Sequence, residues 1–123
     1  MRGVKGAIGQ LGEDAAVAFL KRNGFLIIAR NFRMRNGEVD IIAVENKKEK
    51  TLVFIEVKTR TSEQFGTPGE AITHFKLQAL QRTAVYYKHL HPRLPDMLRI
   101  DAIEIFLSGK TITDIRHVKN ISM

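Results

Sequence analysis

Apolar residues recur at helical spacing near the start of the chain. Residues 6–22 repeat them with the 3.6-residue period of an amphipathic helix, at Ile8, Leu11, Ala15, Ala18 and Phe19. Asn23-Gly24 follows, and glycine is the common residue just past the C-terminal end of a helix. The pattern therefore predicts a first helix over 6–22.

Short apolar runs separated by polar clusters come next. They predict three consecutive strands, at residues 25–33, 38–45 and 51–58. Asn36-Gly37 separates the first two and is typical of a two-residue type I′ turn, in which both central residues have positive φ. The polar residues 46–50 predict a second turn. The two turns therefore predict three consecutive antiparallel strands.

The rest of the chain predicts one more helix and two more strands. Residues 59–68 are polar and contain Gly66 and Pro68, so they are expected to form a loop. A helix is expected over 70–91, with Pro92 and Pro95 ending it and with one stripe made of Ile72, Phe75, Ala79, Thr83, Tyr87 and Leu90. Strands are expected over 98–107 and 111–118, joined by a turn at 108–110. The order α-β-β-β-α-β-β predicts one α/β domain over residues 1–123, with helices packed on a mixed sheet.

Composition narrows the function classes. The 123 residues contain no cysteine, which excludes disulfides, thiolate metal sites and cysteine nucleophiles. No apolar run approaches the ~18 residues of a membrane span, so no membrane partner is expected. The first five residues lack the apolar segment of a secretory signal, and a cytoplasmic location is expected.

The charge is strongly basic and uneven. The formal net charge is +7, and residues 1–35 carry seven basic against two acidic side chains. Such an excess favours a polyanionic partner, because lysine and arginine displace the counterions that condense on nucleic acid. A basic protein without a nucleic-acid partner is the alternative interpretation of charge alone.

Three charged residues interrupt the apolar strands: Asp40, Glu56 and Lys58. If the turn spans residues 46–50, Glu45 pairs with Thr51 and Asp40 lies directly opposite Glu56, with their Cβ atoms about 4.5–5.5 Å apart. Glu56 and Lys58 share a strand face because side chains alternate along a strand. A turn of even length would shift this register by one residue. Under the odd-length turn, two carboxylates and one amine converge.

Two converging carboxylates repel each other unless a cation lies between them. Oxygen ligands without histidine or cysteine favour Mg²⁺ or Mn²⁺ over Zn²⁺. A metal beside a lysine that orients or deprotonates water suits phosphodiester hydrolysis. The alternative is a closed ion-pair network in which Lys58 bridges Asp40 and Glu56 without a ligand.

Several segments together resemble a known family. They are Gly9-Gln10-Leu11-Gly12-Glu13 with Ala16, residues 29–33, residues 37–43, residues 54–60, Phe65-Gly66-Thr67-Pro68 with Glu70-Ala71, Lys76, and Arg99-Ile100-Asp101. On these the sequence resembles the YraN-like family of small bacterial proteins, which is similar to archaeal Holliday-junction resolvases within the PD-(D/E)XK nuclease superfamily. Val39 stands where the superfamily pattern has proline, and Gln81 and Tyr86 are one residue too far apart for a Gln-x-x-x-Tyr motif.

The resemblance implies a restriction-endonuclease-like αβββαβ core and a Mg²⁺-dependent endonuclease acting on branched or structured DNA. It implies that Asp40, Glu56 and the Val57 carbonyl hold the metal, that Lys58 positions water, and that Glu13 supplies a further carboxylate. The alternative function is a non-catalytic nucleic-acid-binding or DNA-processing accessory domain. A purely structural domain with a charged core is the third interpretation.

Secondary candidates follow from the charge and the resemblance. The residues expected to contact the nucleic-acid backbone are Arg30, Arg33, Arg35, Arg60 and Lys76. Arg33 and Arg35 are expected on one strand face, Asp101 is expected to be a structural partner of Arg99, and all four histidines are expected at the surface. Phe65 and the loop after it are a candidate flap over the substrate. A symmetric four-way junction needs two cuts and favours a homodimer, with Ile115, Val118 and Ile121 as candidate contacts.

Overall fold

The computed structural model describes residues 6–61 and 72–121. Its elements follow the expected order and are α1 (Ala7–Arg22), β1 (Phe25–Met34), β2 (Gly37–Glu45), β3 (Thr51–Thr61), α2 (His74–Leu90), β4 (Met97–Ser108) and β5 (Thr111–Val118). Gly24, with φ 85°, follows α1 in the conformation that glycine adopts most easily. Candidate residues within 62–71, namely the Phe65 flap and Glu70-Ala71, lie outside the described residues.

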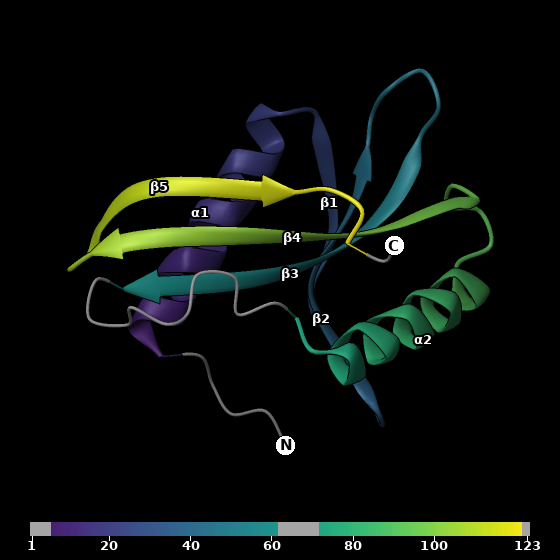
Figure 1. Cartoon of the computed structure of the whole chain (residues 1–123). Coiled ribbons are helices and arrows are strands. Elements are labelled where there is room, and N and C mark those ends of the chain that lie inside the picture. The colour runs from purple at the N-terminus through teal and green to yellow at the C-terminus, as the bar shows by residue number, and fades with distance from the viewer. Residues whose placement is uncertain (1–5, 62–71, 122–123) are drawn as a thin grey trace.

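The five strands form one mixed sheet in the order β1-β2-β3-β4-β5 (Figure 1). β1, β2 and β3 are antiparallel neighbours, β3 and β4 are parallel, and β4 and β5 are antiparallel. Parallel neighbours need a long crossover connection, and the segment between β3 and β4 contains α2. The predicted α/β class with a mixed sheet is thus confirmed.

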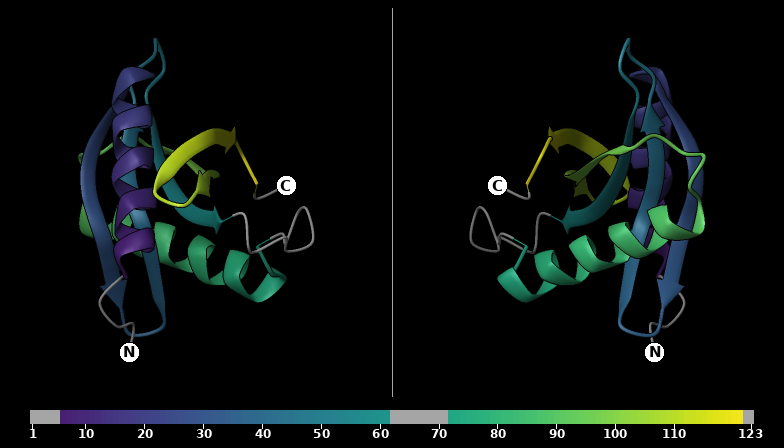
Figure 2. Two further views of the ribbon diagram at one scale, coloured as in Figure 1. Left: turned by 90° about the vertical axis from the view of Figure 1, so that its left-hand side faces the viewer. Right: turned by 90° about the vertical axis from the view of Figure 1, so that its right-hand side faces the viewer.

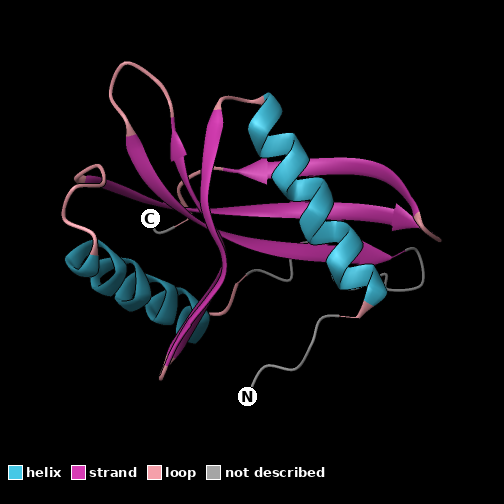
Figure 3. Ribbon diagram, turned by 180° about the vertical axis from the view of Figure 1, so that it is seen from behind, coloured by secondary structure: helices cyan, strands magenta, loops and turns pink. Residues whose placement is uncertain are grey.

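The two helices cover opposite faces of the sheet. α1 lies in front of the strands in Figure 3, which views the molecule from behind, and α2 lies on the other side (Figures 1 and 2). One core forms beneath α1 from Ala16, Val17 and Leu20 together with residues such as Ile41 and Ile103. The other forms beneath α2 from Leu80, Ala84 and Tyr87 with Ile42 and Phe54. Both faces of the central strands are therefore buried.

The register predicted between the second and third strands is confirmed. Glu45 pairs with Thr51 and Ile41 with Ile55, so the turn spans residues 46–50. The next pair in this register is Asp40 with Glu56. The odd length of the turn therefore brings both carboxylates to the same end of the hairpin.

The first hairpin turns one residue earlier than predicted. Met34 pairs with Gly37, so Arg35 and Asn36 form the turn, and neither has positive φ. Gly37 instead begins β2 and lies against α2, where an added Cβ would come within 2.1 Å of Thr83 Oγ1. Thr83 is buried and its hydroxyl donates a 2.8 Å hydrogen bond to the Ala79 carbonyl. Gly37 is thus required for close packing and not for a type I′ turn.

The second helix begins later and faces the sheet differently than predicted. Thr73 precedes its first turn and its Oγ1 accepts a 3.2 Å hydrogen bond from the Lys76 amide, which is a typical helix N-cap. The buried stripe consists of Leu80, Thr83, Ala84 and Tyr87. Phe75 and Leu90, which were expected on it, are 84% and 49% exposed. Polar residues 59–61 likewise continue β3 and do not begin a loop.

The first helix also differs in detail from its predicted stripe. Ala18 is exposed, and the residues buried against the sheet are Gly12, Glu13, Ala16, Val17 and Leu20. An added Cβ at Gly12 would lie 2.1 Å from Thr59 Oγ1, so this glycine lets α1 approach β3 closely. The face of α1 that packs on the sheet is therefore the one that carries its small residues Gly12 and Ala16.

Two remaining expectations concern membranes and self-association. In the described part of the chain, no helix has the length and apolar character needed to cross a membrane. Among the candidate dimer contacts, Ile115 and Ile121 pack against the two cores of their own chain, whereas Val118 is 41% exposed.

Candidate active site

Asp40 and Glu56 lie at the point where paired contacts between β2 and β3 end. Their exposed fractions are 1% and 4%. Asp40 Oδ2 accepts a 2.8 Å hydrogen bond from the Val57 amide, which takes the place of the next ladder bond between the strands. Buried carboxylates need such compensation because leaving water is costly for a charge. The hairpin therefore holds Asp40 rigidly beside Glu56.

Two lysines complete this cluster. Lys76, from the first turn of α2, forms an ion pair with Glu56 Oε2. It lies one helical turn before Leu80 and so continues the stripe of α2 that faces the sheet. Lys58 lies two residues beyond Glu56 on β3 and is half-buried beside Lys76. Lys76 thus supplies a cation to Glu56 that the predicted network, in which Lys58 bridges Asp40 and Glu56, did not include.

Burial and neighbouring charges shift the pKa values of these groups in opposite directions. Burial, together with the negative charge of Asp40, raises the pKa of Glu56 to about 6 although Lys76 opposes the rise. Burial and the charge of Lys76 lower the pKa of Lys58. Burial also disfavours the charged form of Lys76, but the hydrogen bond to Glu56 outweighs it and raises that pKa. Groups with opposing shifts in one cluster are typical of proton-transfer sites.

Glu56 is expected to make the stability of the metal-free protein depend on pH. Its pKa rises from 4.5 to about 6 on folding, so the folded state binds more protons in that window and loses stability as pH rises through it. In EDTA, the unfolding free energy of the wild type relative to Glu56→Gln should fall by about 2 kcal/mol between about pH 4 and about pH 7.5. Urea unfolding at several pH values measures this difference. Parallel curves for the two proteins would contradict it.

Glu13 is fully buried but is joined to a different set of residues. Its Oε2 accepts hydrogen bonds from Arg30 Nε at 2.8 Å and from Asn31 Nδ2 at 3.2 Å. Arg30 also contacts Asp14 at 2.6 Å. Asn31 has φ 53°, and the β1–β2 register places it opposite Asp40. The structure therefore links Glu13 to the β1 strand next to the cluster, and the role of Glu13 as a further carboxylate of the site stays a prediction.

The other arginines expected to contact nucleic acid are dispersed. Arg60 lies beyond Lys58 on β3, and its Nε is 3.4 Å from Glu104 Oε2 on β4. Arg33 is exposed on β1. Arg35 occupies the hairpin turn and does not share a strand face with Arg33, because the turn begins one residue earlier than predicted. Among the five candidates, Lys76 and Arg60 lie on the elements that carry the cluster.

The oxygen atoms that could bind a metal are those of the Asp40 and Glu56 carboxylates and of the Val57 backbone carbonyl. Across residues 6–61 and 72–121, no group of three or more histidine, aspartate or glutamate side chains is gathered closely enough to form a metal site by itself. Two carboxylates nevertheless suffice for Mg²⁺, which keeps several waters and is often bound through one or two carboxylates. Asp40 and Glu56, with the Val57 carbonyl, therefore fit Mg²⁺ or Mn²⁺ chemically.

A second buried charge cluster lies on the α1 face at the start of β4, and the sequence analysis found only part of it. Arg99 contacts Asp101 at 2.8 Å, as expected, and Glu45 at 2.7 Å. His117 Nε2 lies 2.8 Å from Asp101 Oδ2 and its side chain is 10% exposed, so the expectation that all histidines are at the surface is wrong. Lys119 Nζ lies 2.6 Å from Glu45. The spacing Arg99-x-Asp101 was the one local signal for this cluster.

These contacts lower the pKa of both carboxyls. Burial alone would raise the pKa of Glu45, but hydrogen bonds from Lys119 and Arg99 lower it to about 2. Burial likewise opposes ionisation of Asp101, while bonds from His117, Arg99 and the Asn120 amide lower its pKa. All carboxylate oxygens of this cluster are engaged by cations, which is typical of a structural network.

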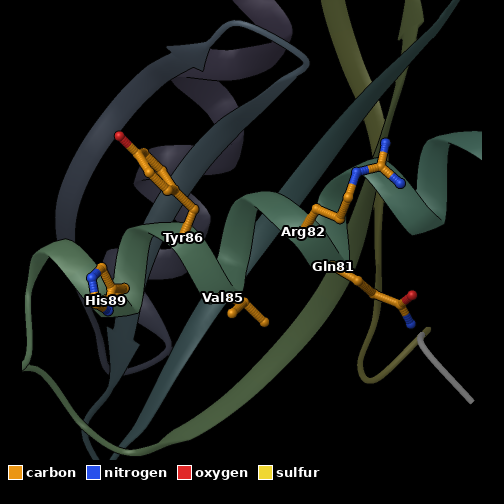
Figure 4. A pocket seen from close by; sticks show the side chains of 5 residues that line it. All are labelled: Gln81, Arg82, Val85, Tyr86 and His89. Atoms are coloured by element: carbon orange, nitrogen blue, oxygen red, sulfur yellow. The ribbon is translucent and has the colours of Figure 1, made fainter.

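A hollow of about 510 Å³ lies on the outer side of α2, away from the carboxylates. Figure 4 shows the side chains that line it, which project from successive turns of the helix: Gln81, Arg82, Val85, Tyr86 and His89. None of these residues belongs to the candidate site. Its five lining side chains include an arginine, a histidine and a tyrosine and no carboxylate.

Comparison with known proteins identifies a family whose members are similar to this chain. The model of a family described as uncharacterised protein family UPF0102 matches residues 12–105. A UPF0102 protein of Caldicellulosiruptor saccharolyticus is 45% identical over 117 residues, which cover 94% of this chain and 97% of that protein. A UPF0102 protein of Geobacter metallireducens is 40% identical, covering 93% of this chain and 90% of its own. One from Mycolicibacterium vanbaalenii is 36% identical, covering 94% and 93%.

Proposed function

This chain belongs to the uncharacterised protein family UPF0102, and we propose that it is a metal-dependent endonuclease that hydrolyses phosphodiester bonds in branched or otherwise structured DNA. The observation that carries the proposal is the buried pair Asp40 and Glu56 with Lys58 on the same strand as Glu56. Such a pair is costly to bury, and its compensating contacts include the Val57 amide on Asp40 and the ammonium of Lys76 on Glu56.

The order of the elements supports the same proposal. The run α1-β1-β2-β3-α2-β4, with an antiparallel meander followed by a parallel strand, agrees with the restriction-endonuclease-like αβββαβ core that the YraN-like resemblance implies. In such a core the central hairpin carries the site, and here β2 and β3 carry Asp40, Glu56 and Lys58. β5 is added at the edge beyond β4.

In the proposed reaction, Asp40, Glu56 and the Val57 carbonyl would hold Mg²⁺ or Mn²⁺, which would stabilise the charge that develops on the phosphate and acidify water. The Val57 amide fixes the orientation of the Asp40 carboxylate. Lys58, whose pKa is lowered by burial, would hold the attacking water and remove its proton. Lys76 and Arg60 would contact phosphate oxygens beside the scissile bond, since both lie on the elements that carry the cluster.

The proposal is tested by incubating the protein with end-labelled four-way junctions, flaps and linear duplexes in Mg²⁺, Mn²⁺, Ca²⁺ or EDTA. Products with Mg²⁺ or Mn²⁺ and none with EDTA are expected. Thermal melting in the same buffers should show a rise in midpoint with divalent cation that is lost in Asp40→Asn. Products that are independent of metal, or equal cation stabilisation of wild type and Asp40→Asn, would contradict the proposed site.

A non-catalytic nucleic-acid-binding domain is the second candidate. It is favoured by the ion pair between Lys76 and Glu56, because this contact satisfies a site carboxylate without any metal. The same experiment separates the two functions. Binding to DNA that weakens steeply with salt, without metal-dependent products on any substrate, would assign the binding function.

A further inference from the structure

Phe75 is an unusual residue for its position. It lies in the first turn of α2, next to Lys76, and 84% of it is exposed, the largest exposed fraction among the large apolar side chains of the described residues. The sheet-facing stripe of the same helix is complete without it, since Leu80, Thr83, Ala84 and Tyr87 are buried. Exposing a phenyl ring forgoes the stabilisation that its burial would give. A smaller residue at position 75 would therefore serve the fold about as well as Phe75 does.

Its place relative to the candidate site is defined by Lys76. Consecutive helical residues are about 1.5 Å apart along the axis and about 100° apart around it. Lys76 points toward the sheet and pairs with Glu56, so Phe75 lies at the rim of the cluster with its ring on the solvent side. The Phe75 ring is thus next along the helix to the lysine that would contact a phosphate at the site.

The charge around Phe75 favours a polyanion. The 17 residues of α2 include no aspartate or glutamate, and His74 and Lys76 flank Phe75 in the first turn. Lys58 and Arg60 add two cations on β3, where Lys58 lies beside the carboxylate cluster and Arg60 lies 3.4 Å from Glu104. An exposed aromatic ring among phosphate-binding cations is the arrangement by which proteins bind single-stranded nucleic acid, with bases stacked on the ring.

We propose that Phe75 stacks on an unpaired nucleobase next to the phosphate bound at the candidate site, so that the substrate carries unpaired nucleotides there. The inference rests on the proposed function and specifies its substrate class as flaps, gaps or open junctions. Inside a continuous duplex both faces of every base are covered by its neighbours, and the ring has no base to contact. Phe75 thus determines specificity and takes no part in the chemical step.

The experiment measures binding in EDTA, where cleavage does not occur. A fluorescent base analogue, 2-aminopurine, is placed in the unpaired arm of a flapped duplex and in a fully paired duplex. Wild-type protein should quench the analogue in the flap. Phe75→Ala should lose that quenching and bind the flap about tenfold more weakly, as expected for the loss of one base–aromatic stack, while binding the paired duplex as the wild type does.

Two further variants make the result specific. Phe75→Trp keeps an aromatic ring and should retain both quenching and affinity. Leu90→Ala removes an exposed apolar side chain from the other end of α2 and should change neither. The inference would be overturned if quenching persisted in Phe75→Ala or if the variant bound flap and duplex more weakly to the same extent. It would also be overturned if Phe75→Ala formed a smaller oligomer than the wild type and bound the flap equally well. Since no metal is present, absence of cleavage bears on the proposed function alone, whereas failure of the wild type to bind any DNA overturns both.

Discussion

Replacing Lys58 with methionine is expected to slow DNA cleavage by about 10²- to 10⁴-fold, the contribution typical of a positioned acid–base group. Methionine keeps most of the side-chain length and removes the amine. Lys58 is half-buried on β3, and burial and Lys76 lower its pKa, which makes it the amine of the cluster best suited to give up a proton. Single-turnover cleavage of a labelled flap in Mg²⁺ measures the effect.

The control variants separate chemistry from charge. Lys110→Met removes a lysine from the exposed turn between β4 and β5 and should cut at the wild-type rate. Lys58→Arg keeps the charge but holds it in a planar group that does not release its proton, and should remain slow. DNA affinity of Lys58→Met in EDTA should stay within about threefold of wild type, because Lys58 is assigned to water and Lys76 and Arg60 to the phosphates. Cleavage by Lys58→Met at the wild-type rate would exclude Lys58 from the chemical step.

The largest expected loss of stability follows the replacement of Asp101 by alanine. Asp101 is fully buried and accepts bonds from Arg99, His117 and the Asn120 amide. Removing one member of a buried ionic network leaves its partners uncompensated, which costs about 3–5 kcal/mol. Urea unfolding should show this decrease in the free energy of unfolding at neutral pH.

Asp96→Ala is the matched control for this prediction. Asp96 also forms an ion pair, with Lys88 at 3.0 Å, but its side chain is 98% exposed. Exposed pairs contribute about 0–1 kcal/mol, so the variant should unfold nearly as the wild type does. A similar loss in both variants would show that burial of the Asp101 network is not what stabilises the protein.

The sequence was sufficient to predict the central hairpin because its register depends on local features. Five polar residues between two apolar runs fix the pairing of Glu45 with Thr51, and this pairing determines the position of Asp40 relative to Glu56. The element order was likewise predictable from periodicity and from turn residues such as Gly24 and Gly109. Each of these signals lies within a few residues of the element that it determines.

The features that were missed depend on contacts between distant segments. The ion pair between Lys76 and Glu56 depends on how α2 is rotated on the sheet. The predicted stripe was right at Thr83 and Tyr87 and wrong at Phe75 and Leu90. The alternative spacing Leu80, Thr83, Ala84, Tyr87 was present in the sequence but was no stronger than the predicted one. Gly37 was assigned to a turn because the presence of Thr83 beside it is not visible locally.

The left-handed backbone of Asn31 has a consequence for how copies of this protein meet. β1 is an outer strand of the sheet, and an unbroken outer strand offers a row of amides and carbonyls to which another chain can add. At Asn31 the φ of 53° interrupts that row. The interrupted edge would therefore limit the addition of one copy of the chain to the β1 edge of another.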